Sequence, residues 1–296
     1  MPVLSISTLS KRYGYIQALK ELTLDVYEGQ VLGLLGPNGS GKTTTLGIIL
    51  GIIKADGGNF TWFDGLHNQD HRLKIGAILE TPNFYPYMTA SQNLDVIRQI
   101  KKAEYSDFEE LLRMVNLWDR RDSKFSTYSL GMKQRLAIAA TLIGNPEVLI
   151  FDEPTNGLDP KGIAEVRDIL QKLAKSGKTI IMASHILDEV EKVCSHVAIL
   201  KSGTLLAHGK VGSILTNDIT VEVACSDMQA LHDFIKTLPF VKDFEGHDSH
   251  FDIQIDASLQ PEEINKLAYE AGLYLTHFVF RKRKLEEEFL TITERA

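Results

Sequence analysis

The chain has 296 residues, 44% of them hydrophobic and 24% charged, which is enough for one large globular domain or for a large and a small one. No apolar run approaches the ~18 residues needed to cross a bilayer, and no basic stretch followed by an apolar core opens the chain, so we expect a cytosolic protein. The two cysteines, Cys194 and Cys225, lack C-x-x-C spacing and indicate neither a disulfide framework nor a zinc site.

The net charge of −7 is distributed unevenly along the chain. Residues 1–210 carry 24 basic and 23 acidic side chains, whereas residues 211–296 carry 8 and 16. The acidic second segment argues against nucleic acid as a partner, because nucleic-acid binding requires a basic surface. The change in composition predicts a first domain of residues 1–212 and a small second domain of residues 213–296.

The first predicted elements are strands. Alternating hydrophobic residues indicate strands over 3–8 and 22–27, joined by the turn-prone Tyr13-Gly14-Tyr15. The apolar run Val31–Leu35 indicates a buried strand, and an apolar stretch from Leu46 indicates a helix shortly after it.

The loop between that strand and that helix fits the phosphate-binding pattern G-x-x-x-x-G-K-[ST]. Its glycines allow successive backbone N–H groups to converge on a polyphosphate, and the helix adds positive potential at its N-terminus. Lys42 can reach the β and γ phosphates, and the Thr43 hydroxyl can bind Mg²⁺. The residues expected to hold the nucleotide are Gly36, Asn38, Gly39, Ser40, Gly41, Lys42, Thr43 and Thr44.

Helical patterns dominate residues 84–145, after strands expected at 59–63 and 75–79. Capping boxes are predicted at Thr89 with Gln92 and at Ser106 with Glu109. The expected helices cover about 91–103, 107–116 and 130–144.

The remaining elements predict an α/β fold with a largely parallel sheet. Buried strands at 148–151 and 179–183 flank a helix at 161–175. Residues 219–280 follow the order βαββαβ, which is typical of a small ferredoxin-like α+β domain. A last helix is expected from Leu285.

Two carboxylates follow the strand at 148–151. Ligands of an open parallel sheet bind at the carboxyl ends of its strands, which is where Asp152 and Glu153 lie. Asp152 can hold the hydration shell of Mg²⁺, and Glu153 can orient and deprotonate an attacking water.

With the stretch Tyr128-Ser129-Leu130-Gly131-Met132-Lys133-Gln134-Arg135 added, residues 1 to about 210 resemble the ATPase subunits of ABC transporters. The resemblance implies a P-loop NTPase core of the RecA-like type, with an antiparallel β subdomain and a helical insert. It also implies ATP and Mg²⁺ as ligands. In that family the helix that begins at Ser129 faces the γ-phosphate held by the other subunit, so a head-to-tail dimer with two shared ATP sites is expected.

Other functional positions of the family carry over one by one. Tyr13 matches the aromatic residue that stacks on adenine, although a tyrosine packed at a strand end is an alternative. Asp159, in Asn156-Gly157-Leu158-Asp159, matches the key acid of the loop that crosses the dimer interface. His185 matches the switch histidine that hydrogen-bonds to the γ-phosphate.

Two departures from the family pattern stand out. Glu80 occupies the position of the usual glutamine that contacts Mg²⁺, water and the membrane subunit. A carboxylate can still bind the ion, so we expect a steeper Mg²⁺ dependence of ATPase activity than in a Glu80→Gln variant, and equal Mg²⁺ titrations would contradict this. In the signature, Leu130 and Met132 replace the usual glycine and glutamine, but Ser129 and Gly131 are retained, so activity is expected to persist.

The glutamate at position 80, the following Phe84-Tyr85-Pro86 and the signature together look most like exporters with ABC-2-type permeases, which include drug, bacitracin and lantibiotic self-protection systems. The expected partners are a separate polytopic permease and a second ATPase subunit, taken as a second copy of this chain although a different subunit is left open. The expected location is the inner face of the cell membrane.

Two alternatives to transport are a non-transport ABC ATPase on the ribosome and a DNA-repair ATPase. The first usually joins two ATPase halves in one chain, and the second needs a long insert, whereas only about 87 residues separate Lys42 from Ser129. Residues 213–296 are expected to regulate or dimerise. The stretches 281–284 and 247–250 are interpreted as a solvated basic turn and a surface loop.

Overall fold

The computed structural model describes residues 1–65, 69–79, 82–104, 107–214, 218–256 and 261–282. The chain divides into two compact units, Met1–Gly209 and Lys210–Ala296, three residues before the boundary predicted from composition. In the described part of the chain, each helix is too short or too polar to span a bilayer.

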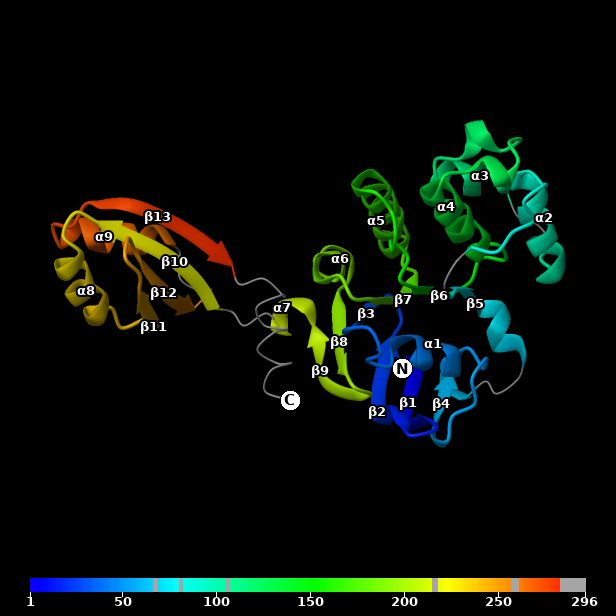
Figure 1. The fold of residues 1–296 in the computed structure, drawn as a ribbon, viewed down its shortest axis with the longest axis horizontal. Coiled ribbons are helices and arrows are strands. Elements are labelled where there is room, and N and C mark those ends of the chain that lie inside the picture. Colours follow the sequence, from blue (N-terminus) through cyan, green and yellow to red (C-terminus); the bar gives the residue numbers. More distant parts are fainter. Residues whose placement is uncertain (66–68, 80–81, 105–106, 215–217, 257–260, 283–296) are drawn as a thin grey trace. The chain divides into compact units, whose positions relative to one another are not determined.

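A six-stranded sheet forms the centre of the first unit (Figure 1). Each residue of the inner strands β6, β7 and β3 is buried, which explains why these segments are continuous apolar runs. The pairings β5–β6, β6–β7, β7–β3 and β3–β8 are all parallel. In order across the sheet, the strands are β5 (Ile75–Ile78), β6 (Val148–Asp152), β7 (Thr179–Ser184), β3 (Val31–Leu35), β8 (His196–Lys201) and β9 (Thr204–Lys210).

A three-stranded antiparallel sheet covers the helix α1 (Lys42–Ile49). Its strands are longer than predicted and lie in the order β2 (Ile16–Tyr27), β1 (Pro2–Tyr13) and β4 (Gly57–Trp62). One core joins both sheets through α1, which contributes Leu46 and Ile49. The indole N–H of Trp62 donates to the carbonyl oxygen of Ile49 at 2.8 Å, so the buried polar atom of this large side chain is satisfied.

The predicted helical insert is present between β5 and β6. It contains α2 (Ala90–Ile100), α3 (Phe108–Met114) and α4 (Leu130–Thr141). The capping box of Thr89 and Gln92 is confirmed. The predicted cap of α3 is wrong: the side chain of Asp107 accepts from the Glu110 N–H, and Ser106 lies outside the described residues. Short 3-10 helices lie at Phe63–Gly65, Gln69–Lys74, Trp118–Arg120 and Phe125–Thr127.

Two helices follow inner strands of the six-stranded sheet. Helix α5 (Pro160–Lys175) follows β6, and α6 (Leu187–Val193) follows β7. Because β6, β7 and β3 run parallel, the loops that start these helices leave the sheet at the same edge as the loop before α1. The ATP site predicted from the sequence is therefore expected at this edge of the sheet.

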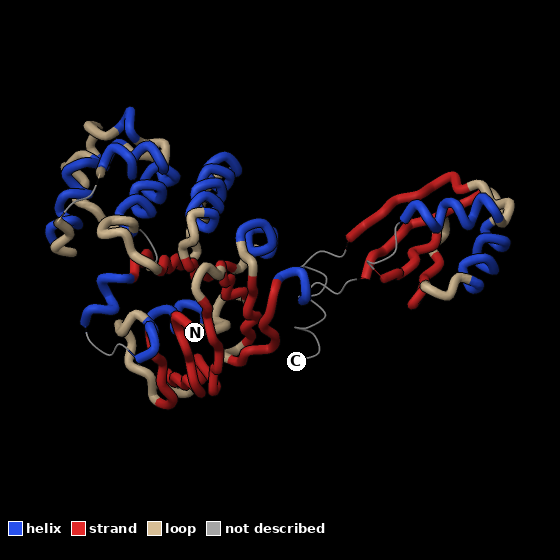
Figure 2. Tube along the Cα trace, turned by 180° about the vertical axis from the view of Figure 1, so that it is seen from behind, coloured by secondary structure: helices blue, strands red, loops and turns tan. Residues whose placement is uncertain are grey.

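The second unit has the predicted ferredoxin-like order. After α7 (Val211–Ile214), its sheet has the antiparallel order β11-β12-β10-β13. Figure 2 shows the helices of this unit beside the strands, and α8 and α9 pack on one sheet face through Leu231, Ile235 and Ile264. The elements are β10 (Asp218–Cys225), α8 (Met228–Thr237), β11 (Val241–Gly246), β12 (Phe251–Asp256), α9 (Pro261–Glu270) and β13 (Leu275–Lys282).

Part of the expected basic turn is a strand instead. Arg281 and Lys282 pair with Thr220 and Ile219 of β10, because β13 continues further than the sequence pattern indicates. The last two basic residues and the helix expected from Leu285 lie outside the described residues.

Candidate active site at the edge of the parallel sheet

The phosphate loop between β3 and α1 is shaped by close backbone packing. A Cβ on Gly36 would lie 2.2 Å from the carbonyl oxygen of Leu200, and one on Gly41 would lie 2.6 Å from that of Ala18. Gly41 also has a φ of 106°, which a side chain strongly disfavours. By contrast, the space around the Cβ position of Gly39 is clear of described atoms within 4 Å, so a phosphate can approach the backbone there.

Lys42 is held across this loop rather than extended into solvent. It is 5% exposed, and its Nζ donates to the carbonyl oxygens of Gly36 at 2.7 Å and Pro37 at 3.3 Å. The same Nζ lies 3.4 Å from Oε1 of Glu153. The ammonium group is therefore placed where the loop and the end of β6 meet.

Glu153 joins three segments that are far apart in the sequence. Its Oε2 lies 2.8 Å from Nδ1 of His185 and accepts from the His185 backbone N–H at 3.4 Å, while Oε1 faces Lys42. Its φ of 48° is unusual for a residue with a side chain, and its N–H donates to the Ala183 carbonyl oxygen at 3.0 Å. The strained turn thus aims the carboxylate back over the phosphate loop.

A carboxylate in this position can act as a general base. It can accept a proton from a water near the end of the phosphate chain, while Lys42 neutralises phosphate charge. The carboxylate also favours the His185 tautomer with its proton on Nδ1, which orients the ring.

The oxygen donors at this edge fit Mg²⁺. Thr43 lies exposed in the first turn of α1, and Asp152 ends β6 beside Ala183 of β7. A hydroxyl and a carboxylate are hard donors that suit this ion, which would stabilise phosphate charge when bound. Glu80, the third predicted ligand, lies outside the described residues.

The structure shows a supporting contact that the sequence pattern did not reveal. The Thr155 hydroxyl, two residues after Glu153, donates to Oε2 of the buried Glu189 in α6. Burial raises the pKa of the Glu189 carboxyl. The contact links the loop after β6 to the helix after His185. The position of Glu189, four residues after His185, is the sequence feature that could have indicated it.

Three other predicted residues form a second group. Ser129 caps α4 and accepts from the Met132 N–H at 3.3 Å, and Asp159 caps α5 and accepts from the Gly162 N–H at 2.9 Å. Together with Gly131 they line a hollow of about 430 Å³, whose walls come from residues 129–135 and 157–165. The hollow thus brings the signature and the Asp159 loop together. Lys42, Glu153 and His185 are not among its lining residues.

Tyr13 ends β1 and is not a core residue. It is 46% exposed, and Nζ of Lys11 lies 5.4 Å from the centre of its ring. An exposed ring at this position is available for stacking; its contact with adenine stays a prediction.

Comparison with known proteins decides the family. A family model described as "ABC transporter" matches residues 19–156. An uncharacterized ABC transporter ATP-binding protein, YdbJ of Bacillus subtilis, is 36% identical, and the alignment covers 99% of this chain and 96% of that protein. The chain belongs to the ATP-binding proteins of ABC transporters. The bacitracin transport ATP-binding protein BcrA of Enterococcus faecalis is 34% identical over 97% of this chain and 95% of its own.

Solved ATP-binding cassettes share the fold of the first unit. One is described as the dimeric structure of a post-hydrolysis state of an ATP-binding cassette with ADP and Pi bound; it is 28% identical, with a TM-score of 0.62, and covers 70% of this chain and 98% of its own. This ABC transporter ATP-binding protein is therefore an ATPase, and its Lys42, Glu153 and His185 lie together at one edge of the parallel sheet.

Proposed function

We propose that this ABC ATPase powers an exporter of drug-like or peptide antibiotics through a separate membrane permease. The observation that carries the proposal is the extent of the similarity to the bacitracin transport protein, which runs through both units of the chain. The linearmycin resistance ATP-binding protein LnrL of Bacillus subtilis also aligns over 99% of this chain, at 31% identity. The working location is then the inner face of the cell membrane.

Two copies of the chain pair head to tail in this proposal. The hollow between Ser129 and Asp159 lies at the N-termini of α4 and α5, which are 12 and 16 residues long. Helix N-termini attract anions, so this hollow suits the terminal phosphate of ATP held by Lys42 of the other copy. Mg²⁺ is held by Thr43 and Asp152. Each ATP is then enclosed only when the two copies meet.

The helical insert supplies a surface for the permease. A hollow of about 280 Å³ lies between the end of β5, α2 and α4, and Phe84 and Lys101 are among its lining residues. Beside it in the sequence, Tyr85 and Tyr87 are 48% and 65% exposed, and their ring centres are 5.9 Å apart. Aromatic side chains of this kind are typical of interfaces. The second unit, residues 213–296 as predicted from composition, serves as an accessory or regulatory domain.

The test is a purification of tagged Glu153→Gln protein from detergent-solubilised cells with Mg-ATP. Loss of the base traps the closed dimer, and we expect a polytopic membrane protein in stoichiometric amount. The exposed Glu147, which pairs with Lys74 at 2.9 Å, supplies the control Glu147→Gln, in which turnover continues. Ribosomal or DNA-repair proteins in place of a membrane protein would overturn the proposal.

Substrate class is tested in cells. Deleting the gene should increase sensitivity to peptide antibiotics of the bacitracin type, and the wild-type chain should restore resistance whereas Glu153→Gln should not. Unchanged sensitivity to these compounds would contradict an export role for antibiotics and leave the ATPase assignment intact.

A further inference from the structure

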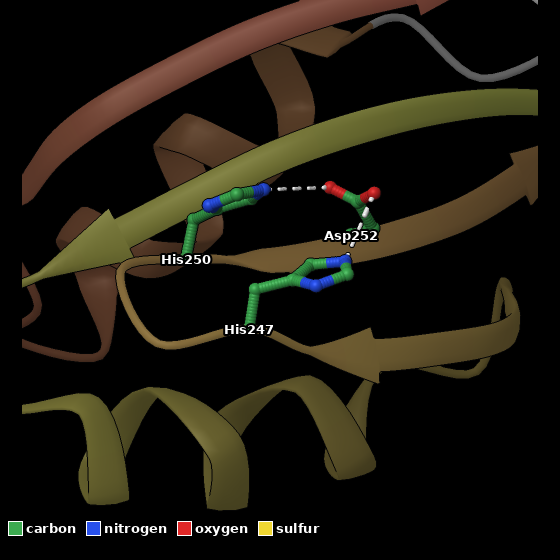
Figure 3. Close-up of side chains that lie close together, drawn as sticks. All are labelled: His247, His250 and Asp252. Atoms are coloured by element: carbon green, nitrogen blue, oxygen red, sulfur yellow. Dashed lines mark ion pairs between the residues drawn. The ribbon is translucent and has the colours of Figure 1, made fainter.

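The turn between β11 and β12 brings together side chains that the sequence pattern placed in a plain surface loop. The His247 N–H donates to the His250 carbonyl oxygen at 2.8 Å, which closes the turn. His250 directly precedes β12, which begins at Phe251, and Asp252 follows two residues later, so their side chains leave the chain on the same side. Figure 3 shows both imidazoles turned toward the carboxylate of Asp252.

The distances in this group suit a tetrahedral metal ion. Nε2 of His247 lies 3.4 Å from Oδ2 of Asp252, and Nε2 of His250 lies 3.3 Å from Oδ1. Ligands of a zinc ion at the usual bond lengths are about 3.4 Å apart. All three donor atoms lie within 4.8 Å of one another.

The hydrogen bonds around the group favour a cation. Oδ1 of Asp252 is enclosed yet accepts no hydrogen bond from the part of the chain that the structure describes. The hydroxyl of Ser249 lies 3.0 Å from Nδ1 of His250. When this Nδ1–H donates to the hydroxyl, Nε2 keeps its lone pair for a metal, which is the usual arrangement of a metal-binding histidine.

Neighbouring strands add negative potential. Glu222 of β10 pairs in register with Asp252, and its Oε2 lies 3.1 Å from Nε2 of His277 on β13. The His277 ring is 5.9 Å from that of His250. This charge arrangement lies on the sheet face opposite the one covered by α8 and α9. The ligands are partly exposed, so an ion can enter and keep a water in its fourth position.

We propose that His247, His250 and Asp252 bind a zinc ion. Two imidazoles and one carboxylate suit zinc, whereas Mg²⁺ and Ca²⁺ prefer sites made of oxygen. The site is built within the second unit alone. It does not depend on the proposed export function.

The test is calorimetric titration of the full chain with zinc chloride. We expect one ion per chain at this site. Removing one of the three ligands, in His247→Asn, His250→Asn or Asp252→Asn, should weaken zinc binding by more than the ~10-fold typical of a change in a residue that only supports a ligand. Ser249→Ala, which removes such a supporting hydroxyl, should weaken zinc binding by about tenfold. His208→Asn, which removes an exposed histidine of β9, should bind zinc as the wild type does.

Two results would overturn the site. One is a titration in which the wild-type chain binds no zinc. The other is unchanged zinc binding in the double variant His247→Asn/His250→Asn, which would place the ion elsewhere. Far-ultraviolet circular dichroism and ATPase activity of the double variant show whether the chain is folded, since both residues belong to the second unit and the predicted ATP-binding residues belong to the first.

Discussion

Glu153→Gln is the change that most directly tests the chemistry of the active site. The glutamine keeps the size of the side chain and a carbonyl oxygen that can accept from Nδ1 of His185, which lies 2.8 Å from the glutamate. It removes the negative charge 3.4 Å from Nζ of Lys42 and the carboxylate that we propose as the base for the attacking water. Geometry is therefore retained while the base is lost.

The expected effects on turnover and on binding differ. Loss of a general base lowers turnover by about 10²- to 10⁴-fold, or roughly 3 to 5 kcal/mol of barrier. The attraction between Lys42 and Glu153 at 3.4 Å is about 5 kcal/mol before desolvation is subtracted, at an effective dielectric constant of ~20. Phosphate oxygens of ATP can replace it, so the variant should bind ATP at least as tightly as the wild type.

The assay measures phosphate release at saturating Mg-ATP and ATP affinity by equilibrium dialysis. Glu147→Gln is the matched control, because Glu147 is exposed and pairs with Lys74. Turnover of Glu153→Gln within about tenfold of the wild type would refute the role of a base, since that role contributes at least ~10²-fold. Loss of ATP binding would refute the claim that the variant keeps the geometry of the site.

Three further changes test the structure at other points. Burial raises the pKa of Glu189 above its ordinary value of 4.5, so the stability of the folded chain falls as pH rises above that value. Glu189→Gln should therefore raise the melting temperature at about pH 8 but not at about pH 4. The control Glu191→Gln, at an exposed position, should leave the melting temperature unchanged at both pH values. Gly36→Ala should abolish binding of a fluorescent ATP analogue, because its Cβ would lie 2.2 Å from a carbonyl oxygen of β8, and wild-type affinity would contradict this. Asn93→Ala should lower the free energy of unfolding in urea by about 2 kcal/mol, because the Tyr85 N–H and carbonyl lose their partner; an unchanged midpoint would count against it.

Elements with strong local requirements were predictable. The phosphate loop needs glycine where Gly36 and Gly41 leave no room for a side chain, and that need is visible in the sequence as a motif. The buried strands were visible as apolar runs for a similar reason. The start of α3 was not, because Ser106 and Asp107 are both good caps and the backbone path selects between them.

The histidine turn shows a limit of a different kind. The sequence pattern predicts only a surface loop at residues 247–250, and it does not indicate that Glu222 is the neighbour of Asp252. Strand register places Glu222 beside Asp252, and this register depends on pairing with a strand about 30 residues away in the chain.

Sequence alone is sufficient to name the chemistry of this protein: a phosphate loop, a carboxylate pair after a buried strand and a signature that opens a helix. Each is a short segment whose backbone and side-chain needs are local. The approach of Lys42, Glu153 and His185 to one another is a property of the folded sheet. It arises because β7 lies between β6 and β3, so their parallel carboxyl ends bring three distant segments to one edge.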